Sequence, residues 1–527
     1  MSLDDFVREL HGDPRKSPQP EAPVDWDDAP LKYKLYRGLP AIPLCPEVPL
    51  ALPGRSAAPE PGLKALGHML WYTYGLTMWS QTYRADPIRQ SAELMQTPRR
   101  YVPSGGGLYP NEIYVYVRTA DAPAGVYHYD AAHHRLLLIR AGEFDEYVSG
   151  VLGGRCRIPD CFAVLFVSAV FWRNFFKYGD FSYRLQGLDT GALIGQTLES
   201  AARFGFSAGV YYQYLDRAVN HLLGLSEREE SVYAIIPLSV KSPDTWFAAG
   251  GDRTADGGEG SRELCRELET VRHRFYERSK RIKPYPLLLR MNEASMQESA
   301  ESFRESAPTL HADSGLRASY LPCAEAAEQD FAAICRARYS PETEFSLRPV
   351  TGEQVSALLR GAAFSCRYRS DLGGASEHPL SRVSLHVCLY SVEGIPDGAY
   401  RYEPVSHALR SLLPGDHRSR LQYGMFLHNI NLFQVPLCFH VTGRADFGKP
   451  EWGYRGYRIQ QMEAGVVVQR LLLAASAVGM AGRPLLGFDA GVCDVMYAIR
   501  PQGGTSLIQI PVGSCHPVTR LQGALHG

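Results

Sequence analysis

The sequence lacks the signatures of several protein classes. Its 55 Lys and Arg residues are balanced by 56 Asp and Glu residues, which excludes the strongly basic surface of a nucleic-acid-binding protein. Its apolar stretches without a charge, such as residues 162–171, are about half as long as a membrane-spanning helix requires. The first residues, MSLDDFVREL, carry two adjacent acids and no apolar core of a signal peptide. These absences predict a cytoplasmic protein without nucleic-acid or membrane partners.

No C-x-x-C pair occurs among the 11 cysteines, and the closest two are Cys156 and Cys161. His133 and His134 have no partnered cluster of metal-ligating residues nearby in the sequence. This pattern favours free core thiols in a reducing compartment over a zinc site or a disulfide framework. We therefore expect no bound metal.

A chain of 527 residues is too long for one ordinary core and predicts several domains. Residues 1–60, rich in Pro, Ala and charge, are expected to form an extended lead-in. Residues 241–315 are expected to form a connector, in which a Gly/Asp loop precedes a charged helix, SRELCRELETVRHRFYERSKRIK. Both segments are candidates for docking a partner, although covering the core is the favoured role. Between and after them lie two blocks, residues 61–240 and 316–527.

The two blocks repeat each other. GVYHYDAAHHRL at residues 125–136 and GAYRYEPVSHAL at residues 398–409 share Gly, two Tyr, an acid, His and Leu. A Tyr-Arg pair recurs at residues 183–184 and 457–458. The same offset of about 273 residues relates two glycine-bearing apolar helices, DTGALIGQTLESAARFG and EAGVVVQRLLLAASAVG. A register held over so long a stretch indicates a duplicated fold.

The two blocks are predicted to contain helices and antiparallel strands in the same order, which indicates an α+β fold for each. Two such units in one chain predict an intramolecular pseudo-dimer with twofold pseudo-symmetry. The expected helices are 63–74 and 352–362, followed by the two apolar helices, and the expected strands are 112–117, 163–170 and 231–237 in block one and 384–389, PLCFHVTG and 506–511 in block two.

Two motifs in block one are candidates for chemistry. In PRRYVPSGGGLYPNE, Pro103 stiffens a loop whose glycines let backbone N–H groups approach a flat or anionic ligand, although a tight turn is an equal alternative. In FWRNFFKYGDF, Lys177 stands beside Tyr178 among phenylalanines, where burial would lower its pKa and make it a proton acceptor. On spacing alone, a surface turn with a solvated lysine is the favoured alternative for the second motif.

PSGGGLYPNE, KYGDFSYR and the glycine-bearing helices together resemble the SagB/McbC-type branch of the nitroreductase superfamily. Members of this branch are FMN-dependent azoline dehydrogenases, which turn thiazolines and oxazolines into thiazoles and oxazoles. The resemblance covers both blocks. It implies two tandem nitroreductase-like domains with FMN at their interface, contacted by both.

The resemblance divides one flavin site between the blocks. In block one the PSGG loop is expected to reach the flavin ring. In block two an Arg-x-Ser pattern is expected to grip the phosphate, and the turn in PLLGFDAGV is expected to direct two backbone amides at flavin N5 and O4. An arginine near the C-terminus is a further candidate for the phosphate. The implied cofactor-binding residues are Pro103, Ser104, Gly105 and Gly106 in block one, and Arg338, Ser340, Leu486, Gly487 and Arg520 in block two.

The opposite site is degenerate in the sequence. The loop ASEHPLSRVS, residues 375–384, has Glu, His and Pro in place of the glycines, and Pro removes an N–H donor. Glu451-Trp452 stands at the position of the Lys-Tyr pair, and YYQYLDRAV lacks the Gly-Phe of the flavin turn. Arg55-Ser56 is the only candidate phosphate grip there. The expectation is one FMN per chain.

The reaction implied by the resemblance removes a proton from the Cα-derived carbon of an azoline and passes a hydride from the adjacent carbon to FMN. Lys177 is the candidate base, and Tyr178 shares the proton or orients the ring. Dioxygen is the expected electron acceptor. The azoline would belong to a ribosomal precursor peptide or to a peptide on a nonribosomal synthetase carrier protein, the latter slightly favoured.

Two other classes of function are compatible with the sequence. An NAD(P)H-dependent nitro or flavin reductase would need no base beside its substrate, so the Lys-Tyr pair argues against it. A non-catalytic scaffold of a peptide-modifying complex would not need to keep the flavin motifs in complementary halves.

Overall fold

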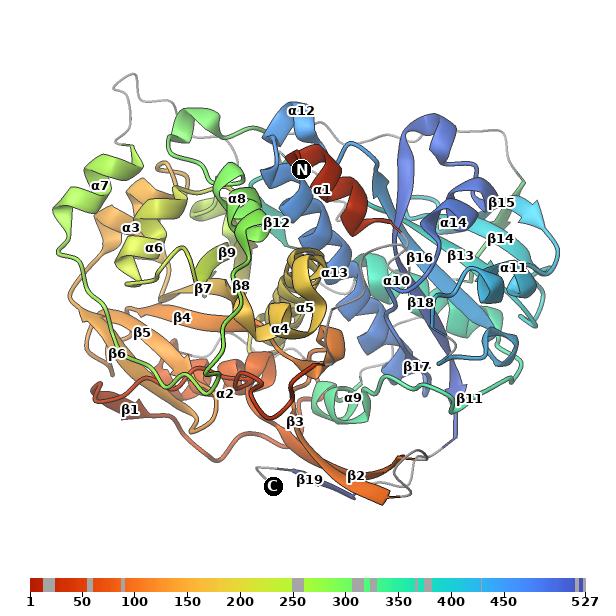
Figure 1. Cartoon of the computed structure of the whole chain (residues 1–527), viewed down its shortest axis with the longest axis horizontal. Helices are drawn as coiled ribbons and strands as arrows, with labels where there is room; N and C mark the ends of the chain where they lie inside the picture. Colours follow the sequence, from red (N-terminus) through yellow and green to blue (C-terminus); the bar gives the residue numbers. More distant parts are fainter. Residues whose placement is uncertain are drawn as a thin grey trace.

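The computed structural model describes residues 1–12, 24–54, 60–86, 91–248, 260–305, 317–322, 329–364, 368–373, 382–427, 429–516 and 521–524. Two mixed α+β halves lie side by side, and two long helices, α5 and α13, pass between them (Figure 1). The predicted fold class is therefore confirmed.

Each half contains a mainly antiparallel sheet, and the two sheets have a similar strand order. The first sheet has the order β1-β6-β5-β4-β7-β9-β8-β12, and the second has the order β10-β15-β14-β13-β16-β18-β11 with β17 paired to β18. The strands of the first sheet are β1 Ala41–Pro43, β4 Asn111–Val117, β5 Gly125–Asp130, β6 Arg135–Ala141, β7 Ala163–Val170, β8 Ser207–Val210, β9 Glu230–Ser239 and β12 Arg369–Ser370. Those of the second are β10 Ala318–Tyr320, β11 Phe345–Ser346, β13 Ser384–Leu389, β14 Gly398–Glu403, β15 Ala408–Pro414, β16 Leu437–Arg444, β17 Ala481–Gly482 and β18 Gly504–Cys515.

Helices cover both faces of each sheet, so the central strands are buried on two sides and read as apolar runs. Strand β7, for example, is the predicted apolar strand AVLFVSAV, and only its last residue is partly exposed. The helices of the first half are α1 Leu3–Leu10, α2 Leu63–Tyr74, α3 Asp145–Val151, α4 Trp172–Tyr178, α5 Ser182–Arg203, α6 Asp216–Leu222, α7 Ser261–Glu267 and α8 Pro286–Ala294. Those of the second are α9 Phe331–Ala337, α10 Gly352–Phe364, α11 Arg418–Tyr423, α12 Lys449–Trp452, α13 Arg455–Ala477 and α14 Ala490–Met496.

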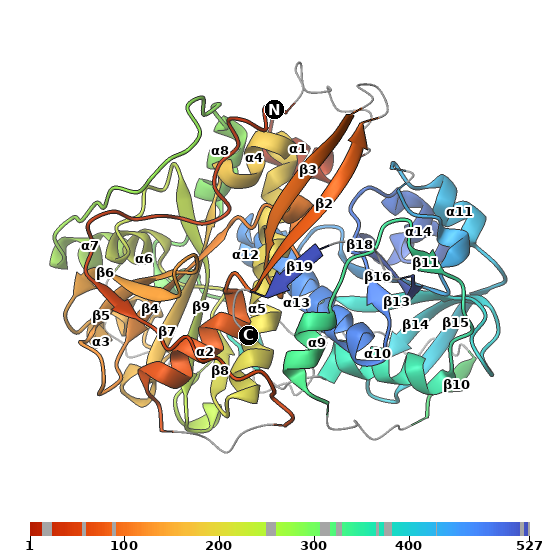
Figure 2. The same ribbon diagram turned by 90° about the horizontal axis from the view of Figure 1, so that it is seen from below.

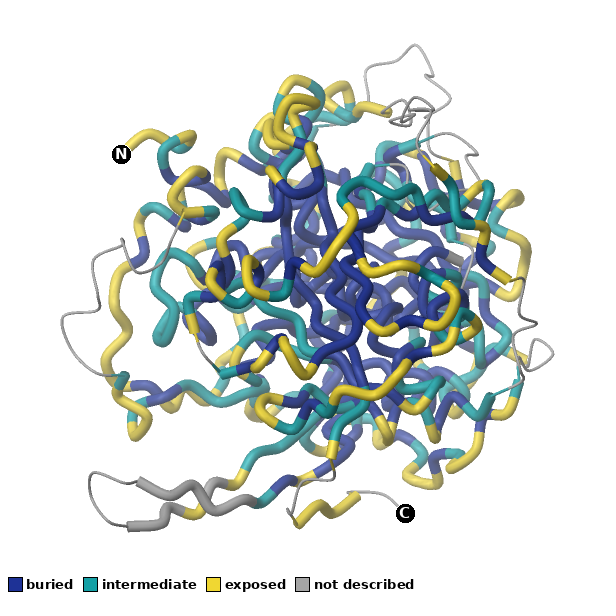
Figure 3. Tube along the Cα trace, turned by 90° about the vertical axis from the view of Figure 1, so that its right-hand side faces the viewer, coloured by how far each residue is buried: buried dark blue, intermediate teal, exposed yellow. Residues whose placement is uncertain are grey.

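Helices α5 and α13 cross with their backbones in contact at the centre of the molecule, where burial is deepest (Figure 3). A Cβ atom on Gly191 would lie 2.0 Å from the carbonyl oxygen of Met462, and one on Gly465 would lie 2.2 Å from that of Leu188. Only glycine permits this approach. Because the two glycines are related by the repeat offset, the crossing marks the pseudo-twofold axis.

Other pairs that lie 273 or 274 residues apart meet across this axis. The side-chain amide of Gln469 donates from Nε2 to Oε1 of Gln196 at 2.6 Å, and both side chains are buried. The rings of Tyr183 and Tyr457 stack with centroids 6.1 Å apart. The structure therefore brings the two copies of the sequence repeat together as a pseudo-dimer.

The second half also contributes strands to the first. Strand β12 of the second half extends the first sheet by pairing parallel to β8. Strand β19, Leu521–Ala524, pairs with β2, Met78–Asp86, which forms a ribbon with β3, Ser91–Arg99 (Figure 2). From the sequence we predict only a loop between the helix at residues 63–74 and the strand at residues 112–117, so this ribbon is not predicted.

Two further expectations need correction. The predicted connector helix ends at Glu267, because the backbone beyond it bonds to the lead-in instead: the amide of Tyr276 donates to the carbonyl of Leu35. This tertiary pairing outweighs helix propensity. The lead-in is not wholly extended either, since residues 3–10 form α1 behind a Ser2 capping box.

The crossing predicts a severe effect of one added methyl group. In Gly191→Ala the new Cβ forces α5 away from α13, and we expect the free energy of unfolding to fall by about 3 kcal/mol in denaturant titrations. Gly352→Ala is the matched control, because a Cβ at this first residue of α10 meets nothing closer than 3.7 Å. Equal stability of the two variants would contradict the crossing.

Candidate active site

The Lys-Tyr pair lies at the end of α4, which follows β7 directly and stops at Gly179, a residue with a positive φ of 54°. The ammonium of Lys177 lies over two aromatic rings, 4.7 Å from the centroid of Tyr178 and 5.5 Å from that of Trp26. Cation–π attraction of this kind holds an ammonium over a ring. The amine is thus half-buried and directed at a defined place, unlike that of a lysine in a solvated turn.

The PSGG loop comes directly against this pair. Residues Gly105–Gly107 form a tight turn in which Gly106 has a φ of 64°. A Cβ on Gly106 would lie 2.5 Å from the Tyr178 hydroxyl oxygen and 3.0 Å from Lys177 Nζ. Glycine is therefore required here for both conformation and space. The structure brings together Gly106, Lys177 and Tyr178, three of the predicted site residues.

Asp189 of α5 fixes the loop from below. Ser104 donates from Oγ to Asp189 Oδ2 at 2.6 Å, and the amide of Gly105 donates to Oδ1 at 3.0 Å. Burial raises the pKa of Asp189 to about 7, although these hydrogen bonds act in the opposite direction. Asp189 is not among the residues predicted from the sequence. An aspartate inside an apolar glycine-bearing helix is the signal that could have identified it.

Arg338 connects the second half to this loop. Its buried guanidinium donates from Nε to the carbonyl of Tyr101 at 2.6 Å and from Nη2 to that of Arg100 at 3.3 Å. Both carbonyls immediately precede Val102 and Pro103. Arg338 thus holds the entry to the PSGG loop, and its contact with a phosphate stays a prediction.

The remaining predicted residues of the second half lie on one connected backbone unit. Arg483 donates from Nη1 to the carbonyl of Ser340 at 3.3 Å, and Leu485 and Gln509 exchange backbone hydrogen bonds. Among the described residues, the amides of the next two positions, Leu486 and Gly487, donate to no partner. Arg520 and Arg55-Ser56 lie outside the described residues.

The pseudo-symmetric site is closed by the chain itself. The repeat offset places Gln213 at the position of Leu486, and here the amide donates to the Asp371 carboxylate at 3.0 Å. The Gln213 side chain is also used, since Nε2 donates to the carbonyl of Arg304 at 2.9 Å and Oε1 accepts from the Arg304 amide. On this side the Asp371 carboxylate therefore occupies the amide donor that corresponds to that of Leu486, and the Arg304 backbone occupies the Gln213 side chain.

Helix α12 is the counterpart of α4 and ends at Gly453, with a φ of 58° like that of Gly179. Its Glu451 accepts from Arg444 Nη1 at 2.7 Å, and its Trp452 donates from Nε1 to the Arg304 carbonyl at 3.2 Å. Neither side chain resembles an amine base. The predicted loop substitutions at residues 377–379 lie outside the described residues.

Buried charges reinforce this closure. Asp216 of α6 pairs with Arg455 at 2.6 Å and with Arg458 at 2.9 Å, and all three side chains are at most 1% exposed. Removing one member would leave an uncompensated buried charge. At the counterpart of Asp189, Glu463 pairs with Arg382.

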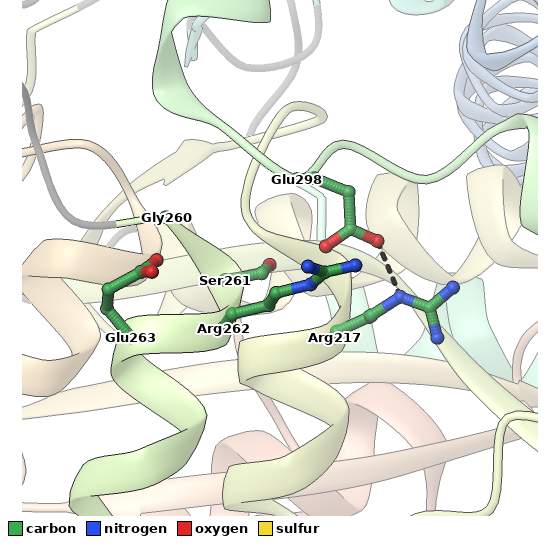
Figure 4. Close-up of a pocket in the computed structure, with 6 residues that line it drawn as sticks. All are labelled: Arg217, Gly260, Ser261, Arg262, Glu263 and Glu298. Carbon is green, nitrogen blue, oxygen red and sulfur yellow. Dashed lines mark hydrogen bonds and ion pairs between the residues drawn. The ribbon is translucent and has the colours of Figure 1, made fainter.

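A pocket of about 480 Å³ lies elsewhere, between α6 and α7 (Figure 4). Its charges are partly paired, since Arg217 donates from Nε to Glu298 at 2.5 Å. None of the predicted site residues lines it. Its lining residues are Arg217, Gly260, Ser261, Arg262, Glu263 and Glu298.

Within the described ranges, no group of three His, Cys, Asp or Glu side chains is arranged to hold a metal ion. The same ranges contain no helix that is both long and apolar enough to cross a membrane.

Comparison with known proteins agrees with this architecture. The model of the nitroreductase family matches residues 80–238 and 335–514, so the chain belongs to the nitroreductase family. A crystal structure of a protein from Anabaena variabilis, named as a nitroreductase, superposes with a TM-score of 0.72 at 20% identity and covers 98% of this chain and 99% of its own. That likeness establishes the tandem fold.

Two curated relatives match shorter stretches. The trifolitoxin-processing protein TfxB of Rhizobium leguminosarum bv. trifolii is 32% identical over 140 residues, which are 25% of this chain and 37% of TfxB. MJ1384 of Methanocaldococcus jannaschii, whose name places it among the nitroreductases, is 26% identical over 140 residues, which are 26% of this chain and 69% of that protein. The match thus spans little more than a third of TfxB.

The position of Asp189 predicts a pH-dependent stability. Its pKa rises from the ordinary 3.8 to about 7 on folding, so its contribution is largest below pH 3.8 and is lost as the pH rises through 7. Asp189→Asn lacks this loss. As the pH rises from 4 to 8, we therefore expect the free energy of unfolding of Asp189→Asn, relative to that of the parent, to increase by a few kcal/mol. One pKa unit corresponds to about 1.4 kcal/mol.

Asp446→Asn provides the control. The hydrogen bond from Arg444 lowers the pKa of Asp446, so the stability that this carboxylate contributes is lost only at acidic pH. The difference in unfolding free energy between Asp446→Asn and the parent should therefore stay nearly constant between pH 5 and 8. A constant difference for Asp189→Asn as well would contradict the account of the loop.

Proposed function

We propose that this chain is an FMN-dependent oxidoreductase that converts peptide thiazolines or oxazolines to thiazoles or oxazoles, with one FMN per chain between its halves. The observation that carries the proposal is the meeting of an amine and a phenol, Lys177 and Tyr178, with the glycine loop at Gly106. Family membership supports a flavin enzyme, and the relative named for processing trifolitoxin supports a role in natural-product maturation.

The residues present fit a flat, anionic cofactor. Gly106 lets the loop backbone lie directly against Tyr178 and Lys177, where a Cβ would clash, and the unpartnered amides of Leu486 and Gly487 are suited to the polar edge of a flavin ring. Arg338 and Ser340 are the proposed phosphate residues, and Arg520 is a further one. When bound, FMN supplies a two-electron acceptor.

In the proposed reaction Lys177 takes the proton from the Cα-derived carbon of the azoline, while the hydride leaves the adjacent ring carbon. Tyr178 lies against both the amine and the loop, so its hydroxyl orients the ring or shares the proton. Loss of one proton and one hydride makes the heterocycle aromatic. Dioxygen is proposed to accept the two electrons afterwards and to form peroxide.

The substrate is proposed to be attached to a larger molecule, a ribosomal precursor or a synthetase carrier protein. The closed pseudo-symmetric side supports this, because it leaves one site and frees the opposite face for a partner. Mixing each kind of azoline substrate with the protein, and comparing their kcat/KM values, distinguishes the two.

The test is oxidation of a synthetic peptide thiazoline, followed as the loss of two hydrogen atoms by mass spectrometry. Lys177→Ala should retain FMN and lower kcat at least about 100-fold, because a positioned general base contributes that much. Lys449→Ala, on the counterpart helix α12, should keep parental activity, since the partners of Lys449 among the described residues are Asp4 and Tyr454, outside the site.

Parental activity of Lys177→Ala would contradict the proposed base. Rapid bleaching of the flavin by NADPH, without any azoline oxidation, would instead favour a nitro or flavin reductase. A protein that takes up no FMN would favour the scaffold.

A further inference from the structure

The lead-in passes directly over the Lys-Tyr pair. The indole of Trp26 lies edge-on to the ring of Phe176, with centroids 5.4 Å apart and planes at 85°, and the ammonium of Lys177 lies over its face. The Trp26 side chain is nevertheless 53% exposed. A large aromatic ring in contact with the proposed base thus keeps half of its surface free.

The position of this indole is fixed by a network of hydrogen bonds. Asp28 accepts from the amides of Lys280 and Arg281 at 2.7 and 3.0 Å, and Ser279 donates from Oγ to the Asp28 carbonyl at 2.7 Å. Ser279 in turn accepts from Trp172 Nε1 at 2.9 Å. Trp172 begins α4, the helix that ends with the Lys-Tyr pair, so the lead-in is bound to the site's own helix.

The lead-in segment that carries Trp26 also contacts the entry to the PSGG loop. The carbonyl of Lys32 accepts from Arg100 Nη2 at 3.0 Å, just before the PSGG loop. Burial, then the charges of Lys177 and Arg100, lower the pKa of Lys32 to about 8. Residues 26–32 therefore run from the Lys-Tyr pair to the loop entry, along the site rather than away from it.

We propose that the exposed part of the Trp26 indole is a wall of the substrate site, against which the flat azoline and its adjoining peptide unit pack beside Lys177. This inference rests on the proposed function. Aromatic faces favour planar, unsaturated rings, and stacking on a fixed indole costs little further ordering. Trp26 is then a positioning residue that selects a planar heterocycle and presents its acidic carbon to the amine.

The experiment compares Trp26→Ala, Trp26→Phe and the parent in the full-length, FMN-loaded protein, with a peptide thiazoline as substrate. Trp26→Ala should raise KM about tenfold while its FMN content stays parental, because one stacking face is lost. Trp26→Phe should restore most of the affinity, which a merely structural role of the indole would not require.

Tyr320→Ala is the matched control, since Tyr320 is a 74% exposed aromatic residue on the edge strand β10 of the other half. Its KM should equal the parental value. An unchanged KM in Trp26→Ala would overturn the inference and leave the proposed function intact.

A parent that oxidises no azoline would instead refute the proposed function. In that case the inference is tested by titrating the protein with the corresponding thiazole peptide and measuring tryptophan fluorescence. Quenching in the parent that is absent in Trp26→Phe reports binding at Trp26. Absence of this Trp26-dependent quenching would overturn the inference, and its presence would support the assignment of Trp26 to the substrate site.

Discussion

The whole arrangement depends on the backbone contact between α5 and α13. Gly191 and Gly465 let the two helices approach within a distance that any side chain would prevent, and the Gln196–Gln469 bond completes the crossing. This contact does more than join two halves. It sets Asp189 of α5 below the PSGG loop and brings the second half close enough for Arg338 to hold the loop entry.

Duplication within one chain allowed the two interfacial sites to diverge. On one side, the glycine loop lies against the Lys-Tyr pair, and among the described residues the amides of Leu486 and Gly487 have no partner and can donate to a ligand. On the other, the Asp371 carboxylate accepts from the Gln213 amide, the Arg304 backbone bonds to the Gln213 side chain, and Asp216 pairs with two buried arginines. A homodimer cannot make this change, because every substitution appears in both of its sites. The closed side contributes buried ion pairs and covers the seam, whereas the open side keeps the groups suited to chemistry.

Much of the fold could be predicted from the sequence because its signals are local. Strands such as Ala163–Val170 and Ser384–Leu389 match their predicted bounds, since apolar runs and alternation report burial directly. The motifs assigned Gly106 and the Lys-Tyr pair to one site, and the structure adds that they lie in contact. Trp26, Asp189 and the connector beyond Glu267 could not be found this way, because each depends on residues distant in the chain. Leu35, for instance, pairs with Tyr276 and thereby removes a helix that local propensity favours.

The central claim is one composite flavin site per chain. It is tested most directly by releasing the flavin from purified, FMN-saturated protein by denaturation and counting it against the protein concentration. The account predicts one FMN per chain. Two per chain would contradict the closure of the pseudo-symmetric site, and none would contradict the flavin site itself.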